Sequence, residues 1–176
     1  MSIPTDAPEE ILHDGRYLQA VRRGQWEFVR RKNTSGIVIL IASTPEDEVI
    51  FVEQYRIPVG ARVVELPAGL AGDIEGHEHE PLERAAAREL EEETGYRPAR
   101  LEEVASGPVS AGLTSEVVTF FRAHDLVRVS DGGGDHHEDI EVHHVARARV
   151  PAWLDEKRRA GVMVDPKVYA ALHFLA

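Results

Sequence analysis

The sequence predicts an α/β (α+β) fold, an α/β/α sandwich with a mixed β-sheet, preceded by a small N-terminal β arm. Segment 36–41 is a nearly continuous run of β-branched and aliphatic residues, which is typical of a strand covered on both faces. Segment 81–94 is rich in strong helix formers and lies among short strand-like segments, and two amphipathic segments end the chain. Strands around one helix, followed by a helical pair, predict a sheet with helices on both sides.

The size and composition indicate one globular domain with an arm in front of it. The chain has 176 residues, of which 43% are hydrophobic and 29% charged, as in an ordinary folded domain. No linker rich in proline, glycine and serine divides the chain. We therefore expect an arm over residues 1–33 and a single domain over residues 34–176.

The charge and the absence of cysteine limit the chemistry of the protein. The formal net charge of -11 repels nucleic acids, so we expect no nucleic-acid partner. A small anion can still bind where divalent cations lie between it and acidic side chains. Without cysteine there is no disulfide, thiolate ligand or thiol nucleophile. No signal sequence or long apolar run is visible, so we expect no membrane partner and a cytoplasmic location.

The arm carries aromatic side chains, such as Tyr17 and Trp26, which we expect another part of the protein to cover. The first strands of the domain follow the arm. Segments 36–41 and 49–52 lie on either side of a turn-like sequence and predict a β-hairpin. A short strand over residues 62–66 is expected to stop at Pro67. A loop rich in glycine, aspartate, histidine and glutamate then covers residues 70–79.

The central helix has clear ends. Pro81 suits the first turn, and Gly95 suits the position just after the last turn. After it we expect three strands, a flexible glycine-rich loop and two helices. Their ranges are 101–105, 117–122 and 140–145 for the strands, 131–137 for the loop, and 151–160 and 165–175 for the helices.

Acidic side chains gather on one side of this helix. Glu89, Glu92 and Glu93 are three and four positions apart, so they project in similar directions. A generic helix of this kind has a solvated face with pairs such as Arg88–Glu92. Here, however, three consecutive acids precede Gly95, at the helix end where the macrodipole disfavours anions. Crowded carboxylates on a rigid support are what hard cations such as Mg²⁺ require.

Residues 88–96 (RELEEETGY) resemble the core of the Nudix box, REUxEExGU, in which U is aliphatic or aromatic. Glu80 stands at the spacing of the earlier glutamate of the box, and residues 65–70 (ELPAGL) are similar to its opening in ADP-ribose pyrophosphatases. Between Gly69 and Glu80 the chain has ten residues where the pattern has five, which a longer loop explains. The resemblance implies a Nudix-type α/β/α sandwich that hydrolyses a diphosphate bond with the help of a metal ion.

Four further segments resemble nucleoside diphosphate sugar pyrophosphatases, in the same order along the chain. They are residues 26–31 (WEFVRR), 53–56 (EQYR), 110–116 (SAGLTSE) and 138–142 (EDIEV). In the third segment Ala111 stands where the usual pattern has proline. This resemblance makes a nucleoside diphosphate sugar the expected partner and ADP-ribose the leading substrate, with AMP and ribose 5-phosphate as products.

The resemblance also implies the metal ligands and the catalytic base. Glu89 and Glu93 are expected to ligate Mg²⁺ or Mn²⁺, with Glu92 as a further ligand or bridge and the carbonyl group of Ala68 as another ligand. Bound metal ions neutralise phosphate oxygens and lower the pKa of a water molecule. Glu116 and Glu138 both fit the base, a glutamate from a later loop. We prefer Glu138 as the base, with Glu116 near the metals, although either could be a solvated acid.

The arm is expected to contact the substrate. The resemblance implies that Trp26 stacks on the nucleobase, that Glu27 also binds the substrate, and that Arg31 and Arg56 bind phosphate or ribose. Trp26 could instead simply pack the arm onto the domain. Relatives usually dimerise with this arm reaching the neighbouring subunit, so a homodimer is implied.

Three alternatives stay open. The substrate could be another sugar nucleotide such as GDP-mannose, for which the glycines at 132–134 are a mild resemblance. The chain could also be a Nudix-like regulatory module that binds ADP-ribose without cleaving it, although such modules tend to lose box carboxylates. A zinc site is the third, but the histidines lie in loops or adjacent pairs, as solvated or edge residues do: His77, His79, His136, His137, His143 and His144.

Overall fold

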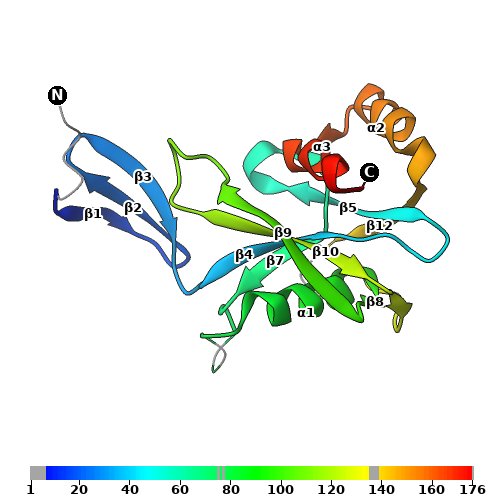
Figure 1. The fold of residues 1–176 in the computed structure, drawn as a ribbon. Coiled ribbons are helices and arrows are strands. Elements are labelled where there is room, and N and C mark those ends of the chain that lie inside the picture. Colours follow the sequence, from blue (N-terminus) through cyan, green and yellow to red (C-terminus); the bar gives the residue numbers. More distant parts are fainter. Residues whose placement is uncertain (1–6, 75, 77, 135–138, 176) are drawn as a thin grey trace.

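Two four-stranded β-sheets between helices form the main body of the protein (Figure 1). The computed structural model describes residues 7–74, 76, 78–134 and 139–175. The strands of the two sheets are β4 (Gly36–Ile41), β5 (Glu48–Arg56), β6 (Ala61–Glu65), β7 (Ala68–Ala71), β9 (Arg100–Pro108), β10 (Val117–His124), β12 (Glu141–Ala146) and β13 (Met163–Val164). The first sheet has the order β7-β4-β10-β9 and the second the order β12-β5-β6-β13. Each contains one parallel pair, β10 with β4 and β13 with β6, so both sheets are mixed, as predicted.

Helices cover the sheets from opposite sides, which confirms the predicted sandwich (Figure 1). Helix α1 packs on the first sheet, and helices α2 and α3 lie against the second. The last turn of α1 ends at Gly95, whose φ of 78° is left-handed and favours glycine, as predicted. The remaining elements are α1 (Leu82–Thr94), α2 (Val150–Arg159), α3 (Pro166–Ala171), the short 3-10 helices η1 (Ile57–Val59), η2 (Arg147–Arg149) and η3 (Leu172–Leu175), and the paired strands β8 (Tyr96–Arg97) and β11 (Val127–Arg128).

Strand β4 lies between two hydrophobic cores. Its Val38 and Leu40 side chains belong to the core under α1, whereas Ile39 and Ile41 belong to the core under α2 and α3. Successive side chains of a strand point to opposite faces, so a strand that is buried on both faces must be apolar throughout. The prediction for residues 36–41 is therefore confirmed.

The predicted hairpin is wrong, because β4 and β5 belong to different sheets. The turn between them closes with hydrogen bonds from Ile50 N to Ala42 O (3.0 Å) and from Thr44 N to Glu48 O (2.8 Å). Beyond the turn each strand has its own two neighbours in its own sheet. Strand β6 stops before Pro67 as predicted, but β7 follows at once and pairs with β4. Strand β7 includes Leu70 and Ala71, the first two residues of the predicted loop.

The N-terminal arm is a three-stranded antiparallel sheet that projects from the main body (Figure 1). Its strands are β1 (Glu9–Asp14), β2 (Leu18–Arg23) and β3 (Trp26–Arg31). The arm meets the main body where Val29 N donates to Leu113 O (2.8 Å) and Ser115 N donates to Val29 O (3.1 Å). It exposes several large apolar side chains: Ile11, Leu12, Tyr17, Leu18 and Trp26. The boundary between arm and domain at residue 33 stays a prediction.

Within the part of the chain that the structure describes, none of the helices has the length and apolar composition needed to cross a bilayer.

Candidate active site

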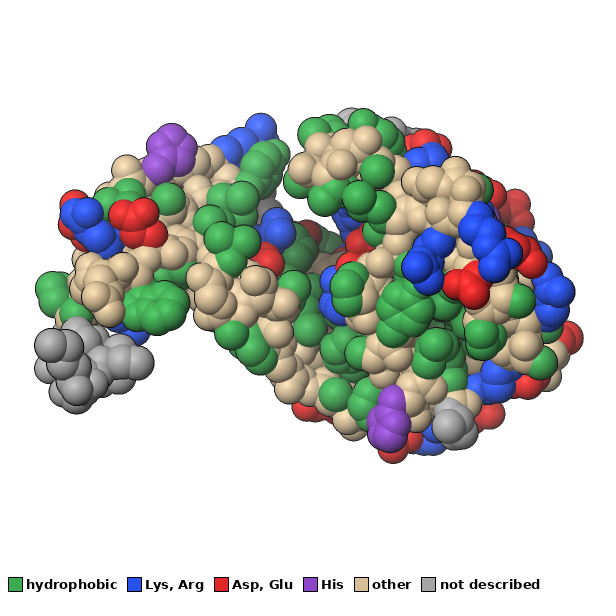
Figure 2. Space-filling view, turned by 90° about the horizontal axis from the view of Figure 1, so that it is seen from above, with side chains coloured by type: hydrophobic (Ala, Val, Ile, Leu, Met, Phe, Trp, Pro, Cys, Tyr) green, Lys and Arg blue, Asp and Glu red, His purple; other side chains and the backbone are tan. Residues whose placement is uncertain are grey.

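A pocket of about 700 Å³ lies between the arm and the main body, beside α1. Figure 2 shows the surface hollowed between these two parts, with acidic and basic side chains inside the hollow. Residues from β3, β5, β7, the loop after β7 and α1 line the pocket. Five of the predicted site residues are among them: Arg31, Arg56, Ala68, Glu89 and Glu92.

Strand β7 and helix α1 pack closely enough to fix two of the box acids. Glu93 is 4% exposed, and its carboxylate accepts a hydrogen bond from Ala68 N (3.0 Å). A Cβ atom on residue 69 would lie 1.9 Å from the carboxyl carbon of Glu89. Only glycine at position 69 therefore lets the Glu89 carboxylate lie against the backbone of β7. The segment ELPAG therefore ends β6 and also provides the backbone against which Glu89 and Glu93 lie.

Arg88 organises the remaining acids of the box. Its guanidinium group donates to Glu89 (2.8 Å), to Glu92 (3.1 Å) and to the carbonyl oxygen of Leu70 (3.0 Å). It also binds Glu80 (3.3 Å), the earlier glutamate of the box. Glu80 therefore lies beside Arg88 in spite of the longer loop before it, and it supports this arginine.

Burial raises the pKa of Glu89 to about 7, because the attraction of Arg88 does not outweigh the loss of water, and Glu92 and Asp73 repel the charge further. A carboxylate in this position is stabilised by a divalent cation. Glu89, Glu92 and Glu93 offer oxygen ligands, the donor set of Mg²⁺ or Mn²⁺. The residues present therefore fit the predicted metal. Among the described residues, these three carboxylates do not form a group whose ligand atoms all lie within 4.8 Å of one another. Arg88 binds Glu89 and Glu92, and Ala68 N–H binds Glu93.

A second acidic cluster lies under α2 and has its own cations. Glu53, Glu141 and His143 bring three ligand atoms within 4.8 Å of one another, the spacing of a metal site. However, Lys157 Nζ (2.6 Å) and Arg62 Nε (2.7 Å) already bind Glu53. Because these two cationic side chains already neutralise the carboxylate of Glu53, we interpret the cluster as a structural ion-pair network and not as a metal site.

His143 lies on an edge strand, β12, which agrees with one of the two expectations for the histidines, but it is not solvated. His143 is mostly buried, donates from Nε2 to the carboxylate of Glu53 (3.1 Å) and packs on Trp153, so it is not a solvated residue. It lies between Val142 and His144 on β12, and the residues it contacts, Glu53 and Trp153, lie elsewhere in the sequence, so no local pattern predicts its burial. Three of the other histidines, His77, His136 and His137, lie outside the described residues.

Of the two predicted bases, Glu138 and Glu116, the structure describes only Glu116. Glu138 lies outside the described residues. Glu116 is bound to Arg31, with 2.7 Å between its carboxylate and Arg31 Nε, and it is not among the residues that line the pocket. The structure thus brings Glu116 to Arg31, a predicted substrate-binding residue, and its predicted place near the metals stays a prediction.

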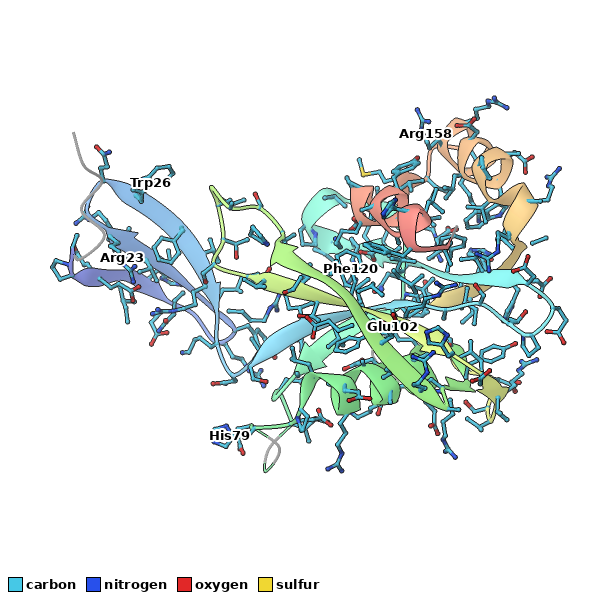
Figure 3. All side chains as sticks on the ribbon, in the orientation of Figure 1. Arg23, Trp26, His79, Glu102, Phe120 and Arg158 are labelled. Atoms are coloured by element: carbon cyan, nitrogen blue, oxygen red, sulfur yellow. The ribbon has the colours of Figure 1, made fainter. Side chains whose placement is uncertain are left out.

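Trp26 and Glu27 lie away from the pocket of their own chain. Both are exposed, and Figure 3 shows Trp26 at the outer end of the arm, away from the main body. Trp26 and Arg31 are the two ends of β3, so about 17 Å of extended strand separates them. Within one chain, therefore, only the inner end of β3 reaches the pocket.

The described half of the predicted flexible loop, residues 131–134, docks on the C-terminus of α1. Gly133 N donates to Glu93 O (2.7 Å) and Gly134 N donates to Glu92 O (3.0 Å). A Cβ atom at Gly132 would lie 2.4 Å from the backbone of Thr94. These bonds satisfy carbonyl groups that the last helical turn leaves free. Composition predicts that these glycines give flexibility, whereas in the structure they permit close approach to the helix that carries the acids.

Comparison with known proteins agrees with this geometry. The family model of the NUDIX domain matches residues 32–164. The chain belongs to the Nudix family. It is 33% identical to the methanol dehydrogenase activator of Bacillus methanolicus, over 80% of this chain and 71% of that protein. It is also 33% identical to the ADP-sugar pyrophosphatase of Mus musculus, over 92% of this chain and 83% of that one.

A solved structure entitled "Crystal structure of ADP compounds hydrolase" has the same fold, with a TM-score of 0.68 at 19% identity, over 96% of this chain and 89% of that one. The family and this fold confirm the Nudix-type sandwich. The family, together with the pyrophosphatase relative, makes the protein a Nudix hydrolase.

Proposed function

We propose that this Nudix hydrolase cleaves the diphosphate bond of a nucleoside diphosphate sugar, with ADP-ribose as the leading substrate and AMP and ribose 5-phosphate as products. One observation carries the proposal: a single pocket is lined by Glu89 and Glu92 and by Arg31 and Arg56. Carboxylates that hold cations and guanidinium groups that bind phosphate are the two components that hydrolysis of a diphosphate needs.

Each group of side chains has its own task in this mechanism. Glu89, Glu92 and Glu93, with the carbonyl group of Ala68, would hold Mg²⁺ or Mn²⁺, which neutralises the phosphate oxygens and activates water. Arg31 and Arg56 bind the diphosphate from the other side of the pocket. Glu138 accepts the proton of the attacking water in our preferred assignment, and Glu116 is the alternative base or a group near the metals.

We further propose that the protein acts as a homodimer. The arm exposes five large apolar side chains, and a second copy of the chain would bury such a surface. Trp26 cannot reach the pocket of its own chain along β3, so it would stack on the nucleobase bound by the partner, with Glu27 beside it. A cytoplasmic location and the absence of nucleic-acid partners stay predictions.

The substrate is tested by incubating the protein with Mg²⁺ and a panel of ADP-ribose, GDP-mannose, UDP-glucose and diadenosine polyphosphates, and by identifying the phosphate-containing products. We expect cleavage of ADP-ribose to AMP and ribose 5-phosphate. Preferred cleavage of GDP-mannose would support the alternative substrate. Binding of ADP-ribose without any product would instead support the regulatory module.

A further inference from the structure

Two arginines that line the pocket are held in the same way. Arg31 Nε donates to the carboxylate of Glu116 at 2.7 Å, and Arg56 Nε donates to the carboxylate of Glu65 at 2.7 Å. Each carboxylate binds the inner nitrogen of its guanidinium group. Among the described residues, neither arginine side chain makes another hydrogen bond, so the two terminal nitrogens of each remain available to a ligand.

We propose that Glu65 and Glu116 are positioning residues, which orient Arg56 and Arg31 to bind the diphosphate of the substrate. This inference rests on the proposed function, because it assumes an anionic substrate between the two arginines. It assigns a role to Glu65, and it replaces the alternative given above for Glu116, as a base or a group near the metals, by a role at Arg31.

The surroundings of the two glutamates support this role. Their side chains are less exposed than those of the arginines they bind, with 14% for Glu65 against 44% for Arg56 and 20% for Glu116 against 34% for Arg31. Neither glutamate lines the pocket, whereas both arginines do. A carboxylate behind an arginine acts on the ligand only through that arginine.

The backbone around Glu116 is also fixed. Glu116 N donates to the hydroxyl group of Thr114 (3.2 Å), and Val109 N donates to Glu116 O (3.2 Å). The same loop pairs with β3 through Leu113 and Ser115, so the loop and the arm strand that carries Arg31 are held together. A guanidinium group that is oriented before the ligand arrives loses less side-chain entropy on binding.

The chemistry of the ligand follows from the free nitrogens. An arginine whose inner nitrogen is occupied presents its two terminal nitrogens as a pair, which matches two oxygens of one phosphoryl group. Two such arginines in one pocket match two adjacent phosphoryl groups. The arrangement therefore favours a diphosphate over a monophosphate.

The experiment is a pair of double-mutant cycles, Arg31→Ala with Glu116→Ala and Arg56→Ala with Glu65→Ala. The Kd for ADP is measured by calorimetry, and kcat and KM for ADP-ribose are measured with Mg²⁺. We expect each glutamate variant to raise Kd and KM about ten- to hundredfold, with a smaller change in kcat. Each double variant should be no worse than its arginine variant, since the glutamate has nothing left to orient.

Several outcomes would overturn the inference. Independent effects in the double variants, tighter ADP binding by Glu116→Ala, a changed pH–rate profile, or a shifted Mg²⁺ requirement would each show that the glutamate acts in another way. Glu116→Gln and Glu65→Gln should restore much of the binding, because an amide oxygen also accepts the hydrogen bond. These two variants also decide the question if an alanine variant fails to fold.

A matched control is the exposed ion pair between Arg149, at the end of η2, and Glu156 of α2. The variant Glu156→Ala should change neither Kd nor KM. The outcome also separates this inference from the proposed function. Cleavage by the wild-type protein with independent mutant effects would refute only the positioning role. Coupled effects on ADP binding without any cleavage of a sugar nucleotide would refute only the proposed function.

Discussion

Glu53 and Glu89 are two buried glutamates whose pKa values move in opposite directions. Their side chains are 4% and 13% exposed, so burial disfavours the charge of both. For Glu53, hydrogen bonds from Lys157 and Arg62 outweigh burial and hold the pKa at about 2. For Glu89, burial outweighs the attraction of Arg88 and raises the pKa to about 7. The fold thus supplies partners for one carboxylate and leaves the other short of positive charge.

The difference in partners distinguishes a glutamate of a structural ion-pair network, Glu53, from a glutamate of the candidate active site, Glu89. Glu53 has two cations and a histidine around it, contributed by three separate elements, β6, β12 and α2. Glu89 shares its one arginine with Glu92 and Glu80. Each shift corresponds to about 3 kcal/mol, in favour of folding for ionised Glu53 and against folding for ionised Glu89. We interpret the ionised carboxylate of Glu89, which the fold alone does not stabilise, as a group that a divalent cation stabilises when it binds.

The largest effect is expected for Glu89→Gln, which removes the charge from the pocket. If Glu89 ligates the metal, kcat/KM for ADP-ribose should fall at least about a thousandfold, since metal ions contribute several kcal/mol to stabilising the transition state. Steady-state kinetics with Mg²⁺ measures this loss. Glu93→Gln should cause a comparable loss, and near-normal turnover in either variant would remove that residue from the metal site.

Glu53→Gln should damage the fold. Lys157 and Arg62 would be left without their buried carboxylate, which costs about 3 kcal/mol of unfolding free energy. For a protein of this size the melting temperature should fall by roughly 6–12 °C. Urea unfolding and calorimetry measure both quantities. A loss no greater than that of Glu156→Gln on the surface would show that the network contributes little.

The pH dependence of stability should separate the two glutamates. Glu53 stabilises the fold above its unfolded pKa of 4.5, and this contribution is lost as the pH falls towards 2. Glu89 behaves in the opposite sense: its protonated form favours the fold below pH 4.5, and this contribution is lost as the pH rises through 7. In metal-free buffer, Glu89→Gln should therefore match the wild-type protein at pH 4.5 and be about 3 kcal/mol more stable above pH 7.

Urea unfolding in a chelator, repeated at several pH values, measures this difference. Added Mg²⁺ should stabilise the wild-type protein and not the variant, because a ligand that binds only the folded state raises its stability. Equal stability of the two proteins at pH 8 without metal would contradict the uncompensated charge at Glu89.

Gly69→Ala should impair catalysis more than folding. The new Cβ would meet the carboxyl end of Glu89, a flexible group that can move aside, so the fold is expected to tolerate it. The displaced carboxylate should lower kcat/KM by about a hundredfold, as small displacements in active sites do. Kinetics and melting temperature are compared with those of Gly107→Ala, where a Cβ meets open space. Equal activity of the two variants would show that the contact between β7 and α1 is not needed.

Much of the fold and the site could be predicted from the sequence, because both depend on local patterns. The run of apolar residues in β4 and the spacing of Glu89, Glu92 and Glu93 are properties of single elements. The hairpin prediction failed because the partner of a strand is decided by packing between sheets, which no local pattern contains. The burial of Glu53 was missed for the same reason, since its partners come from residues 9, 90 and 104 positions away.

The smallest effect is expected for Glu91→Gln, although Glu91 lies within the same acidic triplet as Glu92 and Glu93. One position along a helix turns a side chain by about 100°, and Glu91 binds exposed Arg97 instead of Arg88 or β7. Exposed ion pairs contribute little to stability. Kinetics and melting temperature should therefore match the wild-type protein within error. A loss of activity like that of Glu89→Gln would mean that the charge of the whole triplet, rather than the direction of two or three carboxylates, makes the site.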